Sequence, residues 1–555
     1  MIKTLVIQNF KCFKEKFVLD LKDGINILVG NNEAGKSTIL EAIHLVLTGV
    51  FRGKSIKNNL TQYMFNNTAV AEYIENIKNG TDTTLPEILI ELYFDDRFPE
   101  LEGDKYSEKS SIPRAQGISI TIQIDENYRD EYNKLVESKE IYSLPIEYYE
   151  IVWRSFARKT ITSRSIPIKS ALIDVGFSKF SNGSDMYISR IIQNSLEIIE
   201  KNNVSQSFRK AQELFMQEGS IQQINEKITN ISSLSNKKVE LSVDLGTRSS
   251  WEGSLITRLD NIPFDYVGKG EQAIIKTELA LKNKIAEKSS VILIEEPESH
   301  ISHTRLNQLI SNIKENYGDK QIIVSTHSSF VSNKLGLDNL ILVNNQQVTR
   351  FNNLSNGSKL FFEKIAGYDT LRFILCKKAI LVEGDSDELI VQKAYMSLNN
   401  SRIPIQDGIE VISVGTSFLR FLEIADELKI PTVVITDNDG DIKALERKYD
   451  NYIKTKKKDY VYISYEENEF NGSLKIGKND YNYNTLEPAI IRCNTLDKLN
   501  SILETDFKTE DELRVYMKRN KTECALKIFQ TTQVIEFPAY ILKALEELKE
   551  LNNNE

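Results

Sequence analysis

The stretch GNNEAGKS at residues 30–37 decides the fold, because it fits the pattern G-x-x-x-x-G-K-[ST] at every fixed position. An apolar run at 25–29 leads into it and a helical pattern at 38–47 follows, which predicts a strand, a loop and a helix. Such a loop wraps its amide N–H groups around a polyphosphate, and the helix start adds positive potential. The alternative is an ordinary strand-to-helix turn with a chance lysine, but the full match in this context favours an α/β nucleotide-binding fold.

Within this loop Lys36 is expected to reach the β- and γ-phosphates of ATP, and the Ser37 hydroxyl is expected to bind the accompanying Mg²⁺. The candidate nucleotide-binding residues of the loop are Gly30, Asn31, Asn32, Gly35, Lys36, Ser37 and Thr38.

Length and composition restrict the class of protein. A chain of 555 residues is too long for one core, so we expect two to four domains. No apolar run is long enough to cross a bilayer, and four scattered cysteines without a C-x-x-C pair indicate reduced thiols and no structural zinc. We therefore expect a cytoplasmic protein without membrane contact. The formal net charge of −9 means that any contact with nucleic acid depends on local basic patches or bound metal ions.

Several further patterns indicate secondary structure. Runs at 3–10, 17–21, 87–93 and 118–124 are typical of strands. From 187 to 234 apolar residues recur at helical spacing among polar ones: Ile191, Ile192, Leu196, Ile199, Ile221, Ile224, Ile228 and Ile231. This amphipathic pattern predicts a helical insertion that either dimerises the chain or packs on the nucleotide-binding core. The segment 95–260 otherwise carries no motif.

Three further motifs follow in an informative order. VGKGEQ at 267–272 precedes a helical pattern, VILI at 291–294 ends in two carboxylates, and QIIV at 321–324 is followed by Ser-Thr-His. The first resembles the LSGGEQ signature of ABC ATPases through Gly270, Glu271 and Gln272, with Gly268 in place of the usual serine. A glycine-rich helix start of this kind caps the γ-phosphate held by a partner subunit.

The other two motifs complete an ATPase site. Glu295 is expected to hold the Mg²⁺ through water and Glu296 to polarise the attacking water, while His327 suits a γ-phosphate sensor. The opening NFKCF at 9–13 and the form EEPESH at 295–300 resemble the RecF/SMC-type branch of the ABC ATPases rather than a transporter.

A second group of candidate catalytic residues lies farther along the chain. The apolar run 379–382 leads directly into Glu383, and Asp387 follows four residues later. The run 431–435 ends in a D-x-D motif, Asp437 and Asp439. Parallel strands bring such carboxylates together at one edge of a sheet, where two divalent cations relieve their repulsion and clamp a phosphodiester. This arrangement fits the Toprim fold, a parallel sheet flanked by helices. The alternative is that these acidic residues only cap helices and turns.

The whole order resembles the OLD (overcoming lysogenization defect) family of nucleases, including the nuclease subunits of anti-phage systems such as Gabija. The resemblance implies a two-metal Mg²⁺ or Mn²⁺ site in which Glu383 pairs with Asp387 and Asp437 with Asp439. It also implies Glu487 as a later acidic residue and Lys521 as the lysine that stabilises charge on the scissile phosphate, with Lys527 as the rival for that role. The run Lys456-Lys457-Lys458 either contacts DNA or forms a solvated surface.

The resulting hypothesis is a nucleotide-regulated, metal-dependent DNA endonuclease of anti-phage defence that forms a homodimer or tetramer. A defence-system partner, either a helicase or a reverse transcriptase with a non-coding RNA, is implied in the same way. We predict ATPase parts at 1–165 and 246–360, a helical insertion at 166–245 and a Toprim domain with C-terminal helices at 361–555. Two alternatives remain: a RecF-like DNA sensor or repair clamp that does not cut, and a Toprim primase or topoisomerase.

Overall fold

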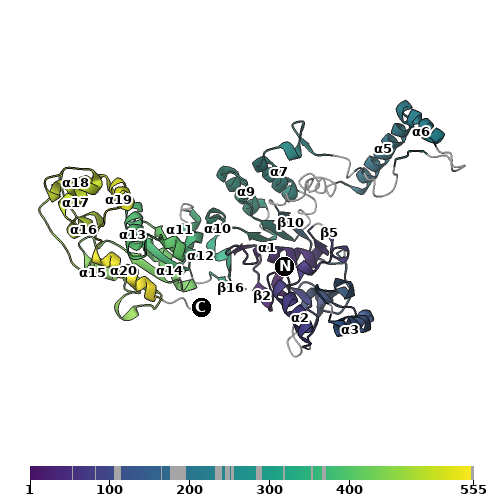
Figure 1. Cartoon of the computed structure of the whole chain (residues 1–555), viewed down its shortest axis with the longest axis horizontal. Helices are drawn as coiled ribbons and strands as arrows, with labels where there is room; N and C mark the ends of the chain where they lie inside the picture. Colours follow the sequence, from purple (N-terminus) through teal and green to yellow (C-terminus); the bar gives the residue numbers. More distant parts are fainter. Residues whose placement is uncertain are drawn as a thin grey trace. The chain divides into compact units, whose positions relative to one another are not determined.

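The computed structural model describes residues 1–551 except 53, 82, 105–113, 140, 164, 175–195, 232–239, 244–250, 252–255, 283–289, 317–318, 345, 352–353 and 365–369. The chain divides into two units (Figure 1). The first comprises Met1–Thr326 and Leu342–Val348, and the second comprises His327–Ile341 and Thr349–Glu555. None of the helices in the described ranges is both long and apolar enough to cross a membrane. The four-part division predicted from the sequence stays a prediction.

The first unit contains an antiparallel sheet in the order β2-β1-β6-β8-β7, with β9 paired to β8. Its strands are β1 (Ile2–Gln8), β2 (Phe17–Asp20), β6 (Ile88–Phe94), β7 (Glu102–Gly103), β8 (Ala115–Ile124) and β9 (Tyr149–Ser155). The strands predicted at 3–10, 17–21, 87–93 and 118–124 are confirmed, with ends that differ by up to three residues. Helices α2 (Asn67–Asn79) and α3 (Arg129–Ser138) also belong to this unit.

A second sheet carries the nucleotide motifs, in the order β10-β13-β14-β3-β15-β16. Its strands are β3 (Ile25–Val29), β10 (Ser170–Asp174), β13 (Val291–Glu295), β14 (Gln321–Ser325), β15 (Leu340–Asn344) and β16 (Gln347–Arg350). The pairs β10·β13, β13·β14 and β14·β3 are parallel, so the ends of β3, β13 and β14 lie at one edge. Strand β10 extends this sheet, although the sequence places its residues in the helical insertion. The first unit also contains helices α1 (Lys36–Thr48), α7 (Lys269–Lys282) and α9 (His303–Asn316).

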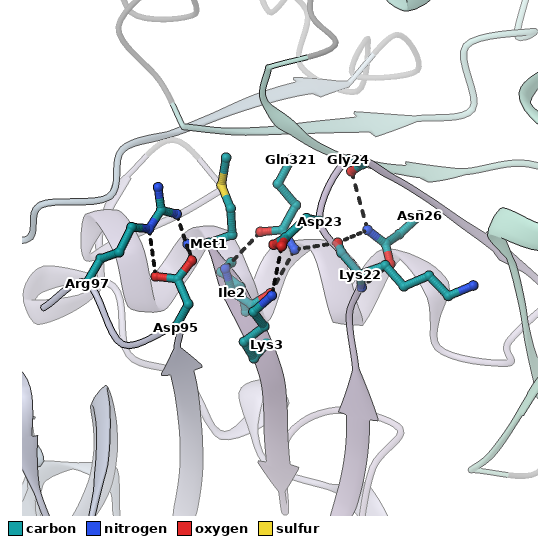
Figure 2. A network of polar contacts seen from close by, with 10 residues as sticks. All are labelled: Met1, Ile2, Lys3, Lys22, Asp23, Gly24, Asn26, Asp95, Arg97 and Gln321. Carbon is teal, nitrogen blue, oxygen red and sulfur yellow. Dashed lines mark hydrogen bonds and ion pairs between the residues drawn. The ribbon is translucent and has the colours of Figure 1, made fainter.

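One buried side chain ties the two sheets together (Figure 2). The Gln321 amide at the start of β14 accepts a hydrogen bond from Ile2 N at 2.9 Å. It donates to Ile2 O at 2.8 Å and to Lys22 O at 2.9 Å, and its residue is fully buried. Gln321 thus satisfies backbone groups of β1 and of the turn before β3, which fixes the strand that leads into the phosphate loop.

Replacing Gln321 with alanine is expected to destabilise the first unit by about 2–4 kcal/mol, because buried backbone groups lose their partners. Both tryptophans, Trp153 and Trp251, lie in this unit, so urea unfolding followed by tryptophan fluorescence reports its stability. Asp23→Ala is the control: its bond to Lys3 is on the surface, and its loss is expected to cost less than about 1 kcal/mol. Equal midpoints for Gln321→Ala and the wild type would refute the bridging role.

Two helices form the described part of the predicted insertion, α5 (Ile198–Gln217) and α6 (Gly219–Ile231). The helical interpretation is confirmed for these residues, whereas Ile191 and Ile192 lie outside the described residues. The apolar side chains Ile199, Leu214, Phe215 and Ile224 are exposed. Dimerisation through this pair stays a prediction.

The second unit is built on a parallel sheet in the order β18-β17-β19-β20. Its strands are β17 (Lys378–Val382), β18 (Ile409–Ser413), β19 (Thr432–Ile435) and β20 (Val461–Ser464). Its longer helices are α10 (Ser329–Leu335), α11 (Asn356–Lys364), α13 (Asp385–Leu398), α14 (Phe418–Leu428), α15 (Ile442–Lys448), α16 (Leu486–Cys493), α17 (Leu496–Leu503), α18 (Glu510–Arg519), α19 (Lys521–Gln530) and α20 (Ala539–Glu550). The buried core joins the strands to α13 and to the C-terminal helices, and α19 packs against α13. The helices therefore position Glu487 and Lys521 against this sheet.

Candidate nucleotide and metal sites

At two positions of the phosphate loop only glycine is compatible with the backbone and its surroundings. Gly35 precedes α1 with a φ of +99°, and a Cβ there would lie 2.6 Å from the Phe13 ring. A Cβ at Gly30 would lie 2.3 Å from the carbonyl oxygen of Val343. The loop therefore approaches its surroundings closely enough to exclude any side chain at these two glycines.

The Lys36 ammonium group sits inside this loop. Its Nζ donates hydrogen bonds to Gly30 O at 2.9 Å and to Asn31 O at 3.0 Å. Burial lowers the pKa of Lys36, while the nearby carboxylates of Glu296, Glu295 and Glu298 act in the opposite direction. The structure thus brings the phosphate loop and the carboxylates at the end of β13 together, as the sequence predicts for a nucleotide-binding site with Mg²⁺.

The carboxylate end of β13 is held to β14. Glu296 N donates to Ser325 O at 2.9 Å, and Glu296 has a positive φ of 42°. The Ser299 hydroxyl donates to Glu296 Oε2 at 3.0 Å, and the Thr326 hydroxyl donates to Glu298 Oε1 at 2.8 Å. Glu298 was not assigned a role from the sequence, although it follows the two expected carboxylates by only two residues. His327 comes directly after Thr326 in the chain and begins the second unit.

The signature-like segment forms a helix start, as predicted. Helix α7 begins at Lys269, so Gly270 and Glu271 lie in its first turn. The Gln272 amide donates to Phe264 O at 2.9 Å and to Val267 O at 2.8 Å, which fixes the turn that leads into the helix. A Cβ at Gly270 would lie 2.8 Å from His300 O, so glycine also allows a close approach here.

The second unit gathers carboxylates at one edge of its parallel sheet. Glu383 follows β17, and Asp437 and Asp439 follow the neighbouring strand β19. Asp387 lies in the first turn of α13, where its Oδ2 accepts a hydrogen bond from Gly384 N at 3.2 Å. Glu487 is buried at the start of α16, where the Thr485 hydroxyl donates to its Oε2 at 3.1 Å.

These carboxylates repel one another. Burial, Glu487 and Glu383 raise the pKa of Asp387 to about 6. Burial raises the pKa of Asp437 well above its usual value, and the charges of Asp387, Glu487, Glu383 and Asp439 add to the shift. The pKa of Glu383 is also raised, by burial and by Asp439, and is opposed by Lys521 and Lys448. Five acidic side chains therefore lie within electrostatic range of one another.

In the ranges that the structure describes, no three His, Cys, Asp or Glu side chains are close enough to form a ready-made metal cage. Repulsion between charges reaches farther than a metal–ligand bond of about 2 Å, which reconciles this finding with the raised pKa values. Mg²⁺ is commonly held by one or two carboxylates together with waters and substrate phosphates. The clustered carboxylates fit divalent cations that are completed by ligands from a substrate.

The two candidate lysines differ in what they contact. Lys521 Nζ forms an ion pair with Glu487 Oε1 at 3.0 Å. Burial acts to lower the pKa of Lys521, but Glu487, Asp437 and Asp387 raise it above its usual value. Lys527 Nζ instead donates to Leu503 O at 2.8 Å and to Glu504 Oε2 at 3.0 Å. The geometry therefore favours Lys521 over Lys527 as the lysine of the carboxylate cluster.

The lysine run after the D-x-D motif is occupied by surface ion pairs. Lys456 pairs with Asp450 at 2.5 Å and Lys458 with Asp426 at 2.6 Å. Lys457 lies 3.9 Å from Glu547. These pairs favour the interpretation of the run as a solvated surface.

Comparisons with known proteins agree with both halves of this description. Residues 4–316 match an AAA domain family, and residues 374–439 match the TOPRIM domain of proteins like the overcoming lysogenization defect protein. The chain is 24% identical to an OLD nuclease of Thermus scotoductus over 79% of this chain and 82% of that protein. It is also 24% identical to an ATP/GTP phosphatase of Helicobacter pylori over 59% of this chain and 85% of that protein.

The solved structures that match parts of the chain include the following two. The C-terminal region of the Xanthomonas campestris OLD protein covers 32% of this chain and 95% of its own, with 22% identity and a TM-score of 0.24. The SMC head domain of Thermotoga maritima covers 63% of this chain and 99% of its own, with 14% identity and a TM-score of 0.28.

Proposed function

Because the chain belongs to the AAA domain family and carries an OLD-like TOPRIM domain, we propose that it is a nucleotide-regulated, divalent-metal-dependent DNA endonuclease. The observation that supports this proposal best is the gathering of five mutually repelling carboxylates, with Lys521 beside them, at the carboxyl edge of a parallel sheet. A structural role alone does not account for so many like charges at one edge, because each raises the cost of ionising the others.

In this proposal Glu383, Asp387, Asp437 and Asp439 hold Mg²⁺ or Mn²⁺, and Glu487 fixes Lys521 against the cluster. The metal ions supply charge stabilisation to the attacking and leaving oxygens of a phosphodiester. Lys521 is positioned to stabilise negative charge on the scissile phosphate. In the first unit the phosphate loop binds ATP, Lys36 contacts its terminal phosphates, Glu295 supports Mg²⁺ and Glu296 orients water.

Separate sites for nucleotide and DNA allow one to regulate the other, since binding energy at one site shifts the conformational equilibrium that the other depends on. We place the protein in anti-phage defence, as a homodimer or tetramer joined through α5 and α6. A helicase, or a reverse transcriptase with a non-coding RNA, is the kind of defence partner proposed.

The test is incubation of supercoiled and linear DNA with the full chain, with and without ATP, in Mg²⁺, in Mn²⁺ and in EDTA. Nicked or linear products that appear only with a divalent metal are expected, and their change with ATP gives the direction of control. DNA binding without cleavage in every arm would favour a sensor or repair clamp. Incorporation of labelled nucleotides into a primer would favour a primase.

Lys521→Ala is expected to lower the rate of DNA cleavage by about a hundredfold or more, because one charge that stabilises the transition state is lost. Lys527→Ala, six residues along the same helix, is expected to retain the wild-type rate because its ammonium group contacts Leu503 and Glu504 instead. Single-turnover cleavage of a labelled duplex measures both rates. A larger loss for Lys527→Ala than for Lys521→Ala would reverse the assignment.

A further inference from the structure

Lys448 is the last residue of α15, the helix that follows the D-x-D motif, and no motif singled it out. Its ammonium group lies over two buried aromatic rings, 5.3 Å from the centre of Phe418 and 5.1 Å from that of Tyr449. Cations placed over aromatic faces are attracted by the ring electrons and held in place. Lys448 is exposed, and the two rings that its ammonium group contacts are held in the core.

Hydrogen bonds link the segment that precedes Phe418 to the backbone of Glu383. Glu383 O accepts hydrogen bonds from Gly415 N at 3.0 Å and from the Ser413 hydroxyl at 3.2 Å. Phe418 begins α14 three residues after Gly415, so the ring beneath Lys448 is anchored next to Glu383. The electrostatic effect of Lys448 on Glu383 agrees with this placement.

Lys448 also differs from nearby lysines in its ion pairing. Lys454, Lys456 and Lys458 form ion pairs with Glu446, Asp450 and Asp426, and Lys521 forms one with Glu487. Among the described residues, no carboxylate forms an ion pair with Lys448. An exposed ammonium group without a carboxylate partner, close to the proposed phosphodiester-cleaving centre, suits a phosphate brought by the substrate.

We propose that Lys448 binds a backbone phosphate of the DNA next to the carboxylate cluster. The inference rests on the proposed endonuclease function and adds a substrate-binding residue to that site. The phosphate contact places the strand over Glu383 and carries no sequence information, because every nucleotide presents the same group. The competing explanation is that Lys448 does not contact DNA and only acts to lower the pKa of Glu383.

Fluorescence anisotropy of a short labelled duplex with the full chain in EDTA, over a series of salt concentrations, separates these explanations. For Lys448→Ala we expect affinity to fall by roughly threefold to tenfold and the slope of log affinity against log salt to become shallower by about 0.9, the effect of one lost phosphate contact. Lys448→Arg is expected to keep the wild-type slope. Lys443→Ala is the matched control, since Lys443 is exposed on the same helix but about 140° around its axis.

If the wild type binds and cuts DNA but Lys448→Ala keeps its affinity and slope, the phosphate contact is wrong and the endonuclease proposal stands. If the wild type itself neither binds nor cuts DNA, the proposed function fails and this inference fails with it. An equal change in slope for Lys443→Ala would also overturn the assignment, because it would show a diffuse effect of charge.

Discussion

Glu383→Ala is expected to reduce DNA cleavage by about a thousandfold or more while ATP hydrolysis continues at the wild-type rate. The reduction follows from the loss of one proposed metal ligand of the cluster. A metal-bound transition state gains several kcal/mol from its ions, and each 1.36 kcal/mol is about tenfold in rate. Plasmid nicking in Mg²⁺ and in Mn²⁺ measures the first activity, and release of inorganic phosphate measures the second.

Glu388→Ala provides the control, because Glu388 lies five residues further along the chain, in α13. Glu388 is partly buried, and its Oε1 accepts a hydrogen bond from Gln392 at 3.1 Å. Burial raises its pKa, but the charges that act on it come from Arg372, Asp385 and Glu410 and not from the cluster. Cleavage by Glu388→Ala is expected to stay within a fewfold of the wild type. Plasmid cleavage by Glu383→Ala at the wild-type rate would rule out the proposed centre.

Lys36→Ala is expected to weaken ATP binding by roughly ten- to a hundredfold, because hydrogen bonds to a charged partner contribute about 1.5–3 kcal/mol. In the present structure the Lys36 ammonium group bonds to carbonyls of its own loop and faces the carboxylates of β13. The loop thus holds a buried cation where the terminal phosphates of ATP are proposed to lie. Titration with a fluorescent ATP analogue measures the affinity.

Lys14→Ala is the control for this substitution, because Lys14 lies in the same unit in an exposed ion pair with Glu72. Its affinity for ATP is expected to match that of the wild type. The Lys36→Ala variant also tests the proposed regulation: any dependence of DNA cleavage on ATP is expected to disappear at nucleotide concentrations that saturate only the wild type. Unchanged ATP affinity in Lys36→Ala would show that the loop does not bind the nucleotide.

The sequence predicts well those elements whose motif or apolar run lies in consecutive residues. The phosphate loop between β3 and α1 and the apolar runs of β13, β14, β17 and β19 are each recognisable within a few consecutive residues. Strand β10 was missed because SALID at Ser170–Asp174 is short and lies outside any motif. Only its pairing with β13 makes these residues a strand.

Side-chain partners were less predictable than strands. The bond between Thr326 and Glu298 joins residues 28 positions apart, and nothing in the spacing of the two motifs specifies it. The sequence favoured Lys521 over its rival Lys527 only through the family resemblance. A helix turns about 100° per residue, so the two ammonium groups point to different surroundings. Lys448 has no motif at all, and only its place over Phe418 and Tyr449 distinguishes it from other surface lysines.

The sequence by itself determined the chemistry of each motif and the order of the two folds, because phosphate loops and acidic strand ends depend on local backbone geometry. The tertiary structure decided which carboxylates interact, which lysine joins them and which sheet contains β10. Those outcomes depend on the pairing of distant strands and the rotation of helices about their axes, which no short stretch of residues specifies.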